Sequence, residues 1–227
     1  MLEKIMISNF GPFKTFEMSF NKNITIIVGK NGSGKTQLLG AIAAVFYGRD
    51  SIKVNNTSVV DEMHISLKFK LLDSQIEVIR TSLNGRLYYE NHRRSISSDR
   101  ISQLRNIDIG EYEPIIINYK NSSLEFDIDL VKKHLYQLKL ENDIMYFLLK
   151  IINRVEQTKV KNAYRIYSGG ERYILELLGL LSFALEDKRK LILIDEFGGE
   201  LDSHSFSILL SLLDSISKEI QVIIVIV

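Results

Sequence analysis

Apolar and polar residues change their spacing several times along the chain, and the first strongly apolar run is Ile24 to Val28. A short continuous run of β-branched residues predicts a buried β-strand. The good helix formers from Gln37 to Ala44 predict a helix soon afterwards, with a glycine-rich loop in between. Before this strand, residues 3–13 and 16–20 predict two further strands joined by a turn at Gly11-Pro12.

Segments in which apolar and polar residues largely alternate follow. Residues 61–73, 75–83 and 86–90 alternate in the way that half-buried strands do. Asn84-Gly85 separates the last two segments, and Asn-Gly between alternating runs is a strong hairpin signal. These segments therefore predict an antiparallel sheet. Residues 113–119 then form a short apolar run that predicts a buried strand.

Helical spacing begins after the polar, basic stretch from Asn91 to Arg105. Residues 129–161 predict one or two helices, and residues 171–181 and 207–220 predict two more. The apolar positions of the first of these segments are Leu130, Leu135, Leu138, Ile144, Phe147, Leu148, Ile151 and Ile152. Its pattern is not a sustained heptad array, and the chain between Thr36 and Ser168 is too short for a long coiled-coil arm.

Two nearly continuous apolar runs predict strands in the C-terminal part of the chain. Residues 191–194 read as a fully buried strand, and residues 221–227 read as a central strand of a parallel sheet. A parallel sheet interleaved with helices and joined to an antiparallel part predicts an α/β domain.

Composition places the chain among ordinary globular proteins. The 227 residues are 45% hydrophobic and 25% charged, enough for one large α/β domain with a small insertion at most. The absence of cysteine excludes disulfides and thiolate metal sites and fits a reducing cytoplasm, which is the expected location. No signal-peptide core or apolar stretch of about 20 residues is found, so we expect no membrane association.

The glycine-rich loop carries the first chemical motif. Gly29, Gly34, Lys35 and Thr36 fit the phosphate-loop pattern G-x-x-x-x-G-K-[ST], between a predicted strand and a predicted helix. Glycines let backbone amides turn toward an anion, and the start of a helix is electropositive. The expected nucleotide-binding residues are Gly29, Asn31, Gly32, Ser33, Gly34, Lys35, Thr36 and Gln37. The alternative is a chance match in a turn, with Lys35 merely solvated.

A second glycine-rich turn, Ser168-Gly169-Gly170-Glu171, directly precedes an apolar helical run. A serine hydroxyl and exposed amides at a helix start can bind an anion. Ser168 and Glu171 also have the spacing of a capping box, which is a purely structural explanation. The two interpretations are compatible.

Two acidic residues, Asp195 and Glu196, follow the apolar run 191–194. The carboxyl end of a parallel strand is where open α/β sheets bind ligands. Asp195 is expected to hold Mg²⁺ together with Thr36, and Glu196 to polarise a water for attack on the γ-phosphate. The alternative is that both carboxylates only end a strand at the surface. Further along, Asp202 or Ser203 could be an ordinary N-cap, and a functional role for Asp202 is the alternative.

Taken in order, these motifs resemble those of the ATP-binding-cassette ATPases, and within them the SMC/RecF/RecN-like branch more than transporter subunits. Residues 6–36 (MISNFGPFKTFEMSFNKNITIIVGKNGSGKT) carry much of this resemblance. YSGGER resembles the signature motif, LILIDE the Walker B strand and ELDS the D-loop.

The resemblance implies one P-loop NTPase head over residues 1–227, with a mixed, largely parallel core sheet flanked by helices. Residues 1–125 would form the phosphate-loop core and the antiparallel β part, and residues 126–165 a short helical lobe. Residues 166–227 would carry the signature, Walker B and D-loop elements.

The resemblance also implies residue roles in a homodimer of heads. ATP, with Mg²⁺ on Thr36 and Asp195, would lie between the phosphate loop of one copy and Ser168, Gly169, Gly170 and Glu171 of the other. Lys35 and Glu196 would be the catalytic residues, and Asp202 would lie across the seam.

The sequence departs from the family pattern at several places. No glutamine lies in the expected glutamine-loop region, where Asn118 is the candidate substitute. Glu171 stands where transporters usually carry glutamine. The switch histidine expected after residues 221–227 is absent, and His204 does not match its position. A lost sensor, a site completed by a partner chain and a truncated product remain three open explanations.

The leading functional hypothesis is an ATPase whose dimerisation acts in DNA repair or maintenance, or gates a partner effector such as an anti-phage defence nuclease. A non-catalytic ATP-binding module and a transporter subunit are the alternatives. Net charge is +1, so any DNA contact has to be local or be built by an assembly. The candidate DNA-contacting residues lie in one polar loop, which could equally be a solvated or protein-docking segment: His92, Arg93, Arg94, Arg100 and Arg105.

Overall fold

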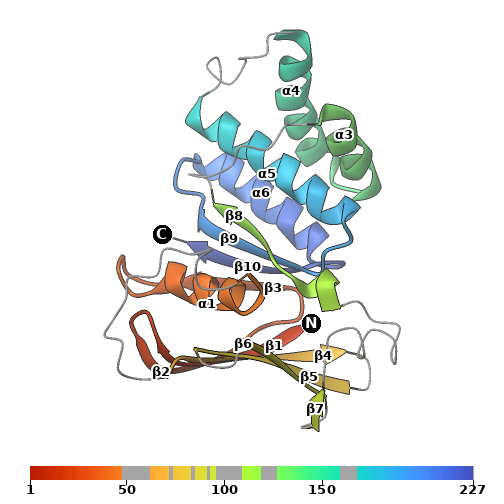
Figure 1. The fold of residues 1–227 in the computed structure, drawn as a ribbon. Helices are drawn as coiled ribbons and strands as arrows, with labels where there is room; N and C mark the ends of the chain where they lie inside the picture. Colours follow the sequence, from red (N-terminus) through yellow and green to blue (C-terminus); the bar gives the residue numbers. More distant parts are fainter. Residues whose placement is uncertain are drawn as a thin grey trace.

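The computed structural model describes residues 1–47, 62–71, 74–82, 85–90, 93–95, 109–118, 127–158 and 168–226. In this part of the chain, two sheets lie on either side of helix α1, and the other helices cover the outer face of one sheet (Figure 1). The layers are thus an antiparallel sheet, α1, a parallel sheet and a group of helices. The predicted combination of a parallel core and an antiparallel part is confirmed.

The antiparallel sheet contains six strands in the order β2-β1-β4-β5-β6-β7. Their bounds are β1 Leu2–Phe10, β2 Phe13–Ser19, β4 His64–Leu71, β5 Ser74–Thr81, β6 Gly85–Glu90 and β7 Arg93–Ser95. The predicted turn at Gly11-Pro12 joins β1 to β2, and the predicted pairing of residues 75–83 with 86–90 is the β5–β6 pair. Asn84, the first residue of the predicted hairpin turn, lies outside the described residues.

The parallel sheet contains four strands in the order β3-β10-β9-β8. Their bounds are β3 Ile24–Val28, β8 Ile115–Asn118, β9 Leu191–Phe197 and β10 Gln221–Ile226. Because β10 pairs in parallel with both β3 and β9, the predicted central strand is confirmed for residues 221–226, and Val227 lies outside the described residues. A short 3-10 turn, Ile109–Tyr112, precedes β8.

The described part of the chain contains five helices, of which α3 and α4 pack against α5 and α6 and not on a sheet. Their bounds are α1 Lys35–Tyr47, α3 Ile128–Gln137, α4 Asn142–Thr158, α5 Gly169–Glu186 and α6 Ser203–Ile216. The helical spacing predicted for residues 129–161 corresponds to the two helices α3 and α4. None of the helices in this part of the chain is both long and apolar enough to cross a bilayer.

The parallel sheet separates two hydrophobic clusters. Leu191 and Leu193 of β9 pack on the side of α1 and the antiparallel sheet, whereas Ile192 and Ile194 pack on the side of α3 to α6. This alternation follows from the period of two in a strand, and it explains why the strand is apolar on both faces.

Gln221 joins the two sheets at the start of β10. Its side-chain carbonyl accepts a hydrogen bond from the Leu2 amide at 2.7 Å, and its Nε2 donates to the carbonyls of Leu2 and Asn21, both at 2.8 Å. The side chain is buried, so a polar residue is stable here only because both ends of the amide are hydrogen-bonded. Strand β1 is thereby fixed against the parallel sheet.

Candidate nucleotide-binding site

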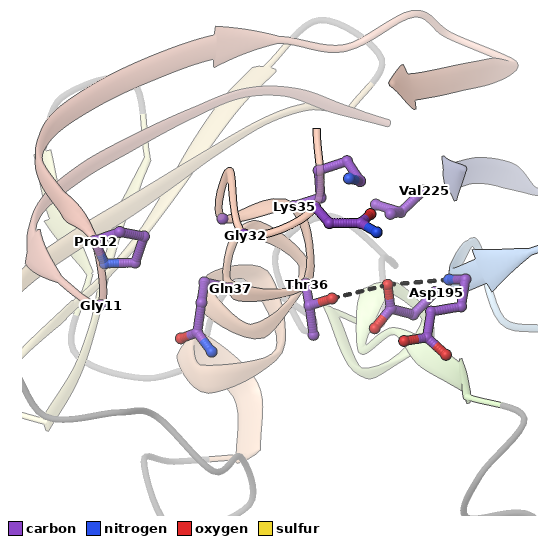
Figure 2. A pocket seen from close by; sticks show the side chains of 11 residues that line it. Gly11, Pro12, Gly32, Lys35, Thr36, Gln37, Asp195 and Val225 are labelled. Carbon is purple, nitrogen blue, oxygen red and sulfur yellow. Dashed lines mark hydrogen bonds between the residues drawn. The ribbon is translucent and has the colours of Figure 1, made fainter. Parts of the chain in front are cut away.

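The phosphate loop connects β3 to α1 and lines a cavity of about 490 Å³. Gly32 and Gly34 have φ angles of +78° and +95°, a region that side chains rarely adopt, so both positions require glycine. The helix begins at Lys35, inside the motif itself, which directs the start of α1 into the cavity (Figure 2). The lining residues are Gly11, Pro12, Asn31, Gly32, Gly34, Lys35, Thr36, Gln37, Asp195, Glu196 and Val225.

The Lys35 ammonium folds back over its own loop. Its Nζ donates to the carbonyl oxygens of Gly29 at 2.6 Å and Lys30 at 3.0 Å. These contacts are exposed, and carbonyl oxygens are weaker partners for an ammonium than phosphate oxygens are. The positive charge is therefore held at the cavity by the loop that would surround the phosphates.

Thr36 and Asp195 meet across the cavity, although they are far apart in the sequence. The Thr36 hydroxyl donates to Oδ1 of Asp195 at 3.1 Å, and Asp195 is only 4% exposed (Figure 2). No group of three or more carboxylate, histidine or cysteine ligands occurs in the described residues. One hydroxyl and one carboxylate suit Mg²⁺, which keeps several waters and completes its shell with substrate phosphates.

A β-bulge at the end of β9 brings the second acid into the same cavity. The pairing with β10 shifts between Ile224 and Ile226, so that Asp195 and Glu196 together oppose Val225. Consecutive residues of a regular strand point to opposite faces, whereas here both acids line one cavity. Glu196 takes a φ of +52°, which is costly for a residue with a side chain, and its amide donates to Oδ1 of Asp195 at 3.1 Å.

The β1–β2 turn contributes a wall that the sequence did not predict. Gly11 and Pro12 line the cavity, and a β-carbon at Gly34 would lie 3.0 Å from both Pro12 and Phe13. The side-chain oxygen of Gln37 is buried beside Gly11, without a hydrogen-bond partner within the described chain. The Gly-Pro turn itself could be recognised in the sequence. That it packs against Gly34 of the phosphate loop depends on the tertiary structure and could not.

The second glycine-rich turn forms the start of α5. Ser168 is the N-cap: its hydroxyl accepts from the Glu171 amide at 3.2 Å, and the Glu171 carboxylate accepts from the Ser168 amide at 3.2 Å. The capping box that the sequence predicted is therefore present. A β-carbon on Gly169 would lie 2.5 Å from the carboxylate of Glu200, and one on Gly170 would lie 3.1 Å from its backbone oxygen.

This turn lies on a second cavity, of about 550 Å³, here called the signature cavity. The cavity at the phosphate loop, here called the nucleotide cavity, has no lining residue in common with the signature cavity. Within one chain, the structure thus brings Lys35, Thr36, Asp195 and Glu196 together and leaves the signature turn elsewhere. The signature cavity is lined by Phe147, Lys150, Ile151, Arg154, Ser168, Gly170, Glu171, Ile174, Asp202 and Ser205.

Asp202 is the N-cap of α6. Its carboxylate accepts from the Ser205 amide at 2.8 Å and from the Ser205 hydroxyl at 2.9 Å. The backbone hydrogen bond from Ser205, followed by that of its hydroxyl, lowers the pKa of Asp202 below its ordinary value. The capping alternative raised from the sequence is therefore realised, and the exposed carboxylate also lines the signature cavity.

The remaining sequence-predicted positions are described only in part. Asn118 ends β8, and its backbone lies beside that of Asp195 in the strand register. Arg93 and Arg94 belong to β7, whereas His92, Arg100 and Arg105 lie outside the described residues. His204 stacks edge-on against Phe147, with ring centroids 5.5 Å apart, and so lies near the signature cavity.

Comparison with known proteins agrees with this arrangement. A family model described as the RecF/RecN/SMC N terminal domain matches residues 1–227. The DNA replication and repair protein RecF of Rickettsia canadensis (strain McKiel) is 27% identical over 117 residues, which is 51% of this chain and 31% of that protein. The chain therefore matches about a third of the length of this relative.

Solved structures have the same fold. The SMC head bound to the C-winged helix domain of ScpA has a TM-score of 0.66 at 18% identity, over 100% of this chain and 89% of that chain. The recombination mediator protein RecF-ATPrS of the RecFOR pathway has a TM-score of 0.58 at 16% identity, over 99% of this chain and 92% of that one. The predicted fold class and the predicted SMC/RecF-like branch are confirmed, and the chain belongs to the RecF/RecN/SMC N-terminal domain family.

Proposed function

We propose that the protein binds ATP with Mg²⁺ and hydrolyses it, and that ATP joins two copies head to tail. The observation that carries this proposal is the meeting of Thr36 with Asp195 at 3.1 Å, with Glu196 beside them in the cavity that the phosphate loop lines. A chance glycine-rich turn would not be expected to have a hydroxyl and two carboxylates at its mouth.

Each group has a role in this proposal. The loop amides and Lys35 neutralise the β- and γ-phosphates. Thr36 and Asp195 hold Mg²⁺, which supplies neutralisation of charge on the phosphate oxygens. Glu196 accepts a proton from a water as that water attacks the γ-phosphorus; the bond to the β–γ bridging oxygen breaks, and ADP and phosphate are the products.

The separation of the two cavities favours a dimer. The signature turn presents a hydroxyl and helix-start amides, but it lines a different cavity from the phosphate loop of its own chain. In a two-fold symmetric pair, each signature turn could close the nucleotide cavity of the other copy, which makes two equivalent sites. Asp202 would then lie at the seam, and Asn118 beside Asp195 would stand in for the glutamine of the glutamine loop.

The cellular role that we propose is DNA repair or maintenance. The named relatives are a DNA replication and repair protein and a recombination mediator, and the SMC head is bound to a partner protein. By analogy, ATP-driven dimerisation would act on DNA, through the arginine-rich segment that begins at Arg93, or on an effector such as a nuclease. A cytoplasmic location is part of this proposal.

The test combines solution mass with phosphate release. We expect Glu196→Gln to form a stable dimer with ATP and Mg²⁺ and to release phosphate at least about 100-fold more slowly than the wild type. Glu219→Gln, an exposed acid after α6, is the matched control and should behave as the wild type.

Turnover that survives in Glu196→Gln would remove Glu196 from its role as the base. ATP binding without turnover in the wild type would instead favour a non-catalytic ATP-binding module. Failure of the wild type to bind any adenine or guanine triphosphate would overturn the proposal entirely.

A further inference from the structure

An ion pair connects the helical lobe to the signature turn. Arg154, in the last turns of α4, pairs through Nη1 with Oε1 of Glu171 in the first turn of α5. The Arg154 side chain is 49% exposed and that of Glu171 24% exposed, so the pair is partly accessible at the edge of the signature cavity.

Glu171 connects Arg154 to Ser168, because it is also hydrogen-bonded to Ser168. Its other carboxylate oxygen accepts from the Ser168 amide at 3.2 Å, while the Ser168 hydroxyl oxygen accepts from the Glu171 amide at 3.2 Å. A hydroxyl oxygen that accepts a hydrogen bond can still donate its own proton, so Ser168 keeps a donor that could reach a ligand. The orientation of Ser168 therefore depends on Glu171, and Glu171 is oriented by Arg154.

Charge gives a second reason for the pair. A carboxylate in the first turn of a helix stabilises that helix, but it repels a phosphate that approaches the same amides. Arg154 offsets the charge of Glu171, and Lys150, one turn earlier on α4, lines the same cavity. The wall of the signature cavity that α4 contributes is thus basic where it faces the turn.

We infer that Arg154 is a positioning residue for the ATP site of the opposite copy: it fixes Glu171, and through it Ser168, while offsetting the charge of the Glu171 carboxylate. This inference rests on the proposed function, because it requires the signature turn to act in trans. The requirement makes a distinctive prediction. A defect at Arg154 should impair the partner's site and leave the nucleotide cavity of its own chain intact.

Single variants give the first part of the test. We expect Arg154→Glu to bind ATP within about twofold of the wild type and to lose about tenfold or more in both ATP-dependent dimerisation and turnover. Arg154→Lys keeps the charge but not the planar fork, so its loss should be smaller. Lys132→Glu is the matched control, because Lys132 forms a similar pair with Glu156 at 2.8 Å between α3 and α4.

Mixed dimers of two variants give the decisive part of the test. If Arg154→Glu lost turnover only because it folds poorly, mixing it with a second inactive variant would not restore turnover. In a mixture of Arg154→Glu with Lys35→Ala, one composite site has an intact phosphate loop and an intact signature turn. Turnover should rise to about threefold or more above the sum of the two variants measured separately. A mixture of the double variant Arg154→Glu/Lys35→Ala with the wild type contains no intact mixed site and serves as the negative control.

The outcomes are separable. Wild-type turnover and dimerisation in Arg154→Glu, or absence of complementation while the wild type remains active, would overturn the role of Arg154 alone. Absence of ATP-dependent dimerisation in both the wild type and Glu196→Gln would overturn the proposed dimer, and this inference with it.

Discussion

The nucleotide cavity and the signature turn each have a glycine-rich turn at the start of a helix, but the two turns are held in different ways. The phosphate loop is fixed by its backbone: two glycines at positive φ, the packing of Pro12 and Phe13 against Gly34, and the bulge at Glu196. The signature turn is fixed by side chains, through the capping box and the Arg154 pair.

The difference indicates a division of labour. Backbone constraints cannot rearrange without breaking the fold, so the nucleotide cavity is suited to a ligand that must be bound in one geometry. Exposed side-chain constraints can be made and broken at little cost, which would suit the reversible contact between two copies that the proposed function requires. Variants that break one set of constraints should therefore leave the other nearly intact.

The largest expected effect is that of Lys35→Ala. Removing the ammonium takes away charge-assisted hydrogen bonds to the phosphates, so ATP affinity should fall about 30- to 100-fold. The thermal midpoint should hardly change, because the contacts of Lys35 within the chain are exposed. Isothermal titration with ATP and Mg²⁺, together with thermal unfolding, would check both parts. A large loss of stability would contradict the assignment of Lys35 to ligand binding.

The next effect is that of Gly34→Ala, which attacks the backbone constraint itself. At a φ of +95° a β-carbon is strained, and it would lie 3.0 Å from Pro12 and Phe13. We expect a loss of about 1–3 kcal/mol in the free energy of unfolding, measured by urea denaturation. Gly32→Ala is the control, because its φ of +78° imposes a similar strain while no atom lies within 4 Å of the added β-carbon, so it should lose less stability.

A smaller loss of unfolding free energy is expected for alanine at the two signature glycines, and it should differ between Gly169 and Gly170. A β-carbon at Gly169 meets the flexible end of Glu200, whereas one at Gly170 meets its backbone oxygen. Gly169→Ala should therefore cost under about 0.5 kcal/mol in unfolding free energy and Gly170→Ala about 1 kcal/mol, both with unchanged ATP affinity in the monomer. If either variant lost monomer affinity, the two regions would not be independent.

The smallest effect concerns pH. The pKa of Asp202 is lowered in the folded chain by the Ser205 hydrogen bonds, so its contribution to stability is present above the ordinary pKa of 3.8 and is lost as pH falls through the lowered value. Asparagine caps a helix without titrating. The quantity to measure is the thermal midpoint of the wild type minus that of Asp202→Asn. This difference should be constant near neutrality and decrease by about 2 °C or less below pH 4. No change in this difference would contradict the capping geometry.

The sequence predicted well those features that depend on local spacing. The apolar runs predicted the strands β3, β9 and β10, and the motif residues predicted the loop that starts α1. The capping box at Ser168 also followed from spacing alone. Each of these is decided by residues within a few positions of one another.

The sequence could not predict features that depend on long-range contacts. The Gly11-Pro12 wall, the Gln221 bridge and the Arg154–Glu171 pair join residues from separate elements. The positive φ of Glu196 was also missed, because nothing in an apolar run followed by two acids indicates a bulge. Such features require the strand order, which periodicity does not specify.

The strand order of the parallel sheet has a consequence for biosynthesis. Strand β3 is made early, yet its only partner in the described sheet is β10, which leaves the ribosome nearly two hundred residues later. During translation, the backbone N–H and C=O groups of β3 that later pair with β10 therefore stay unpaired. A nascent chain arrested before Gln221 should expose these groups to chaperones and proteases.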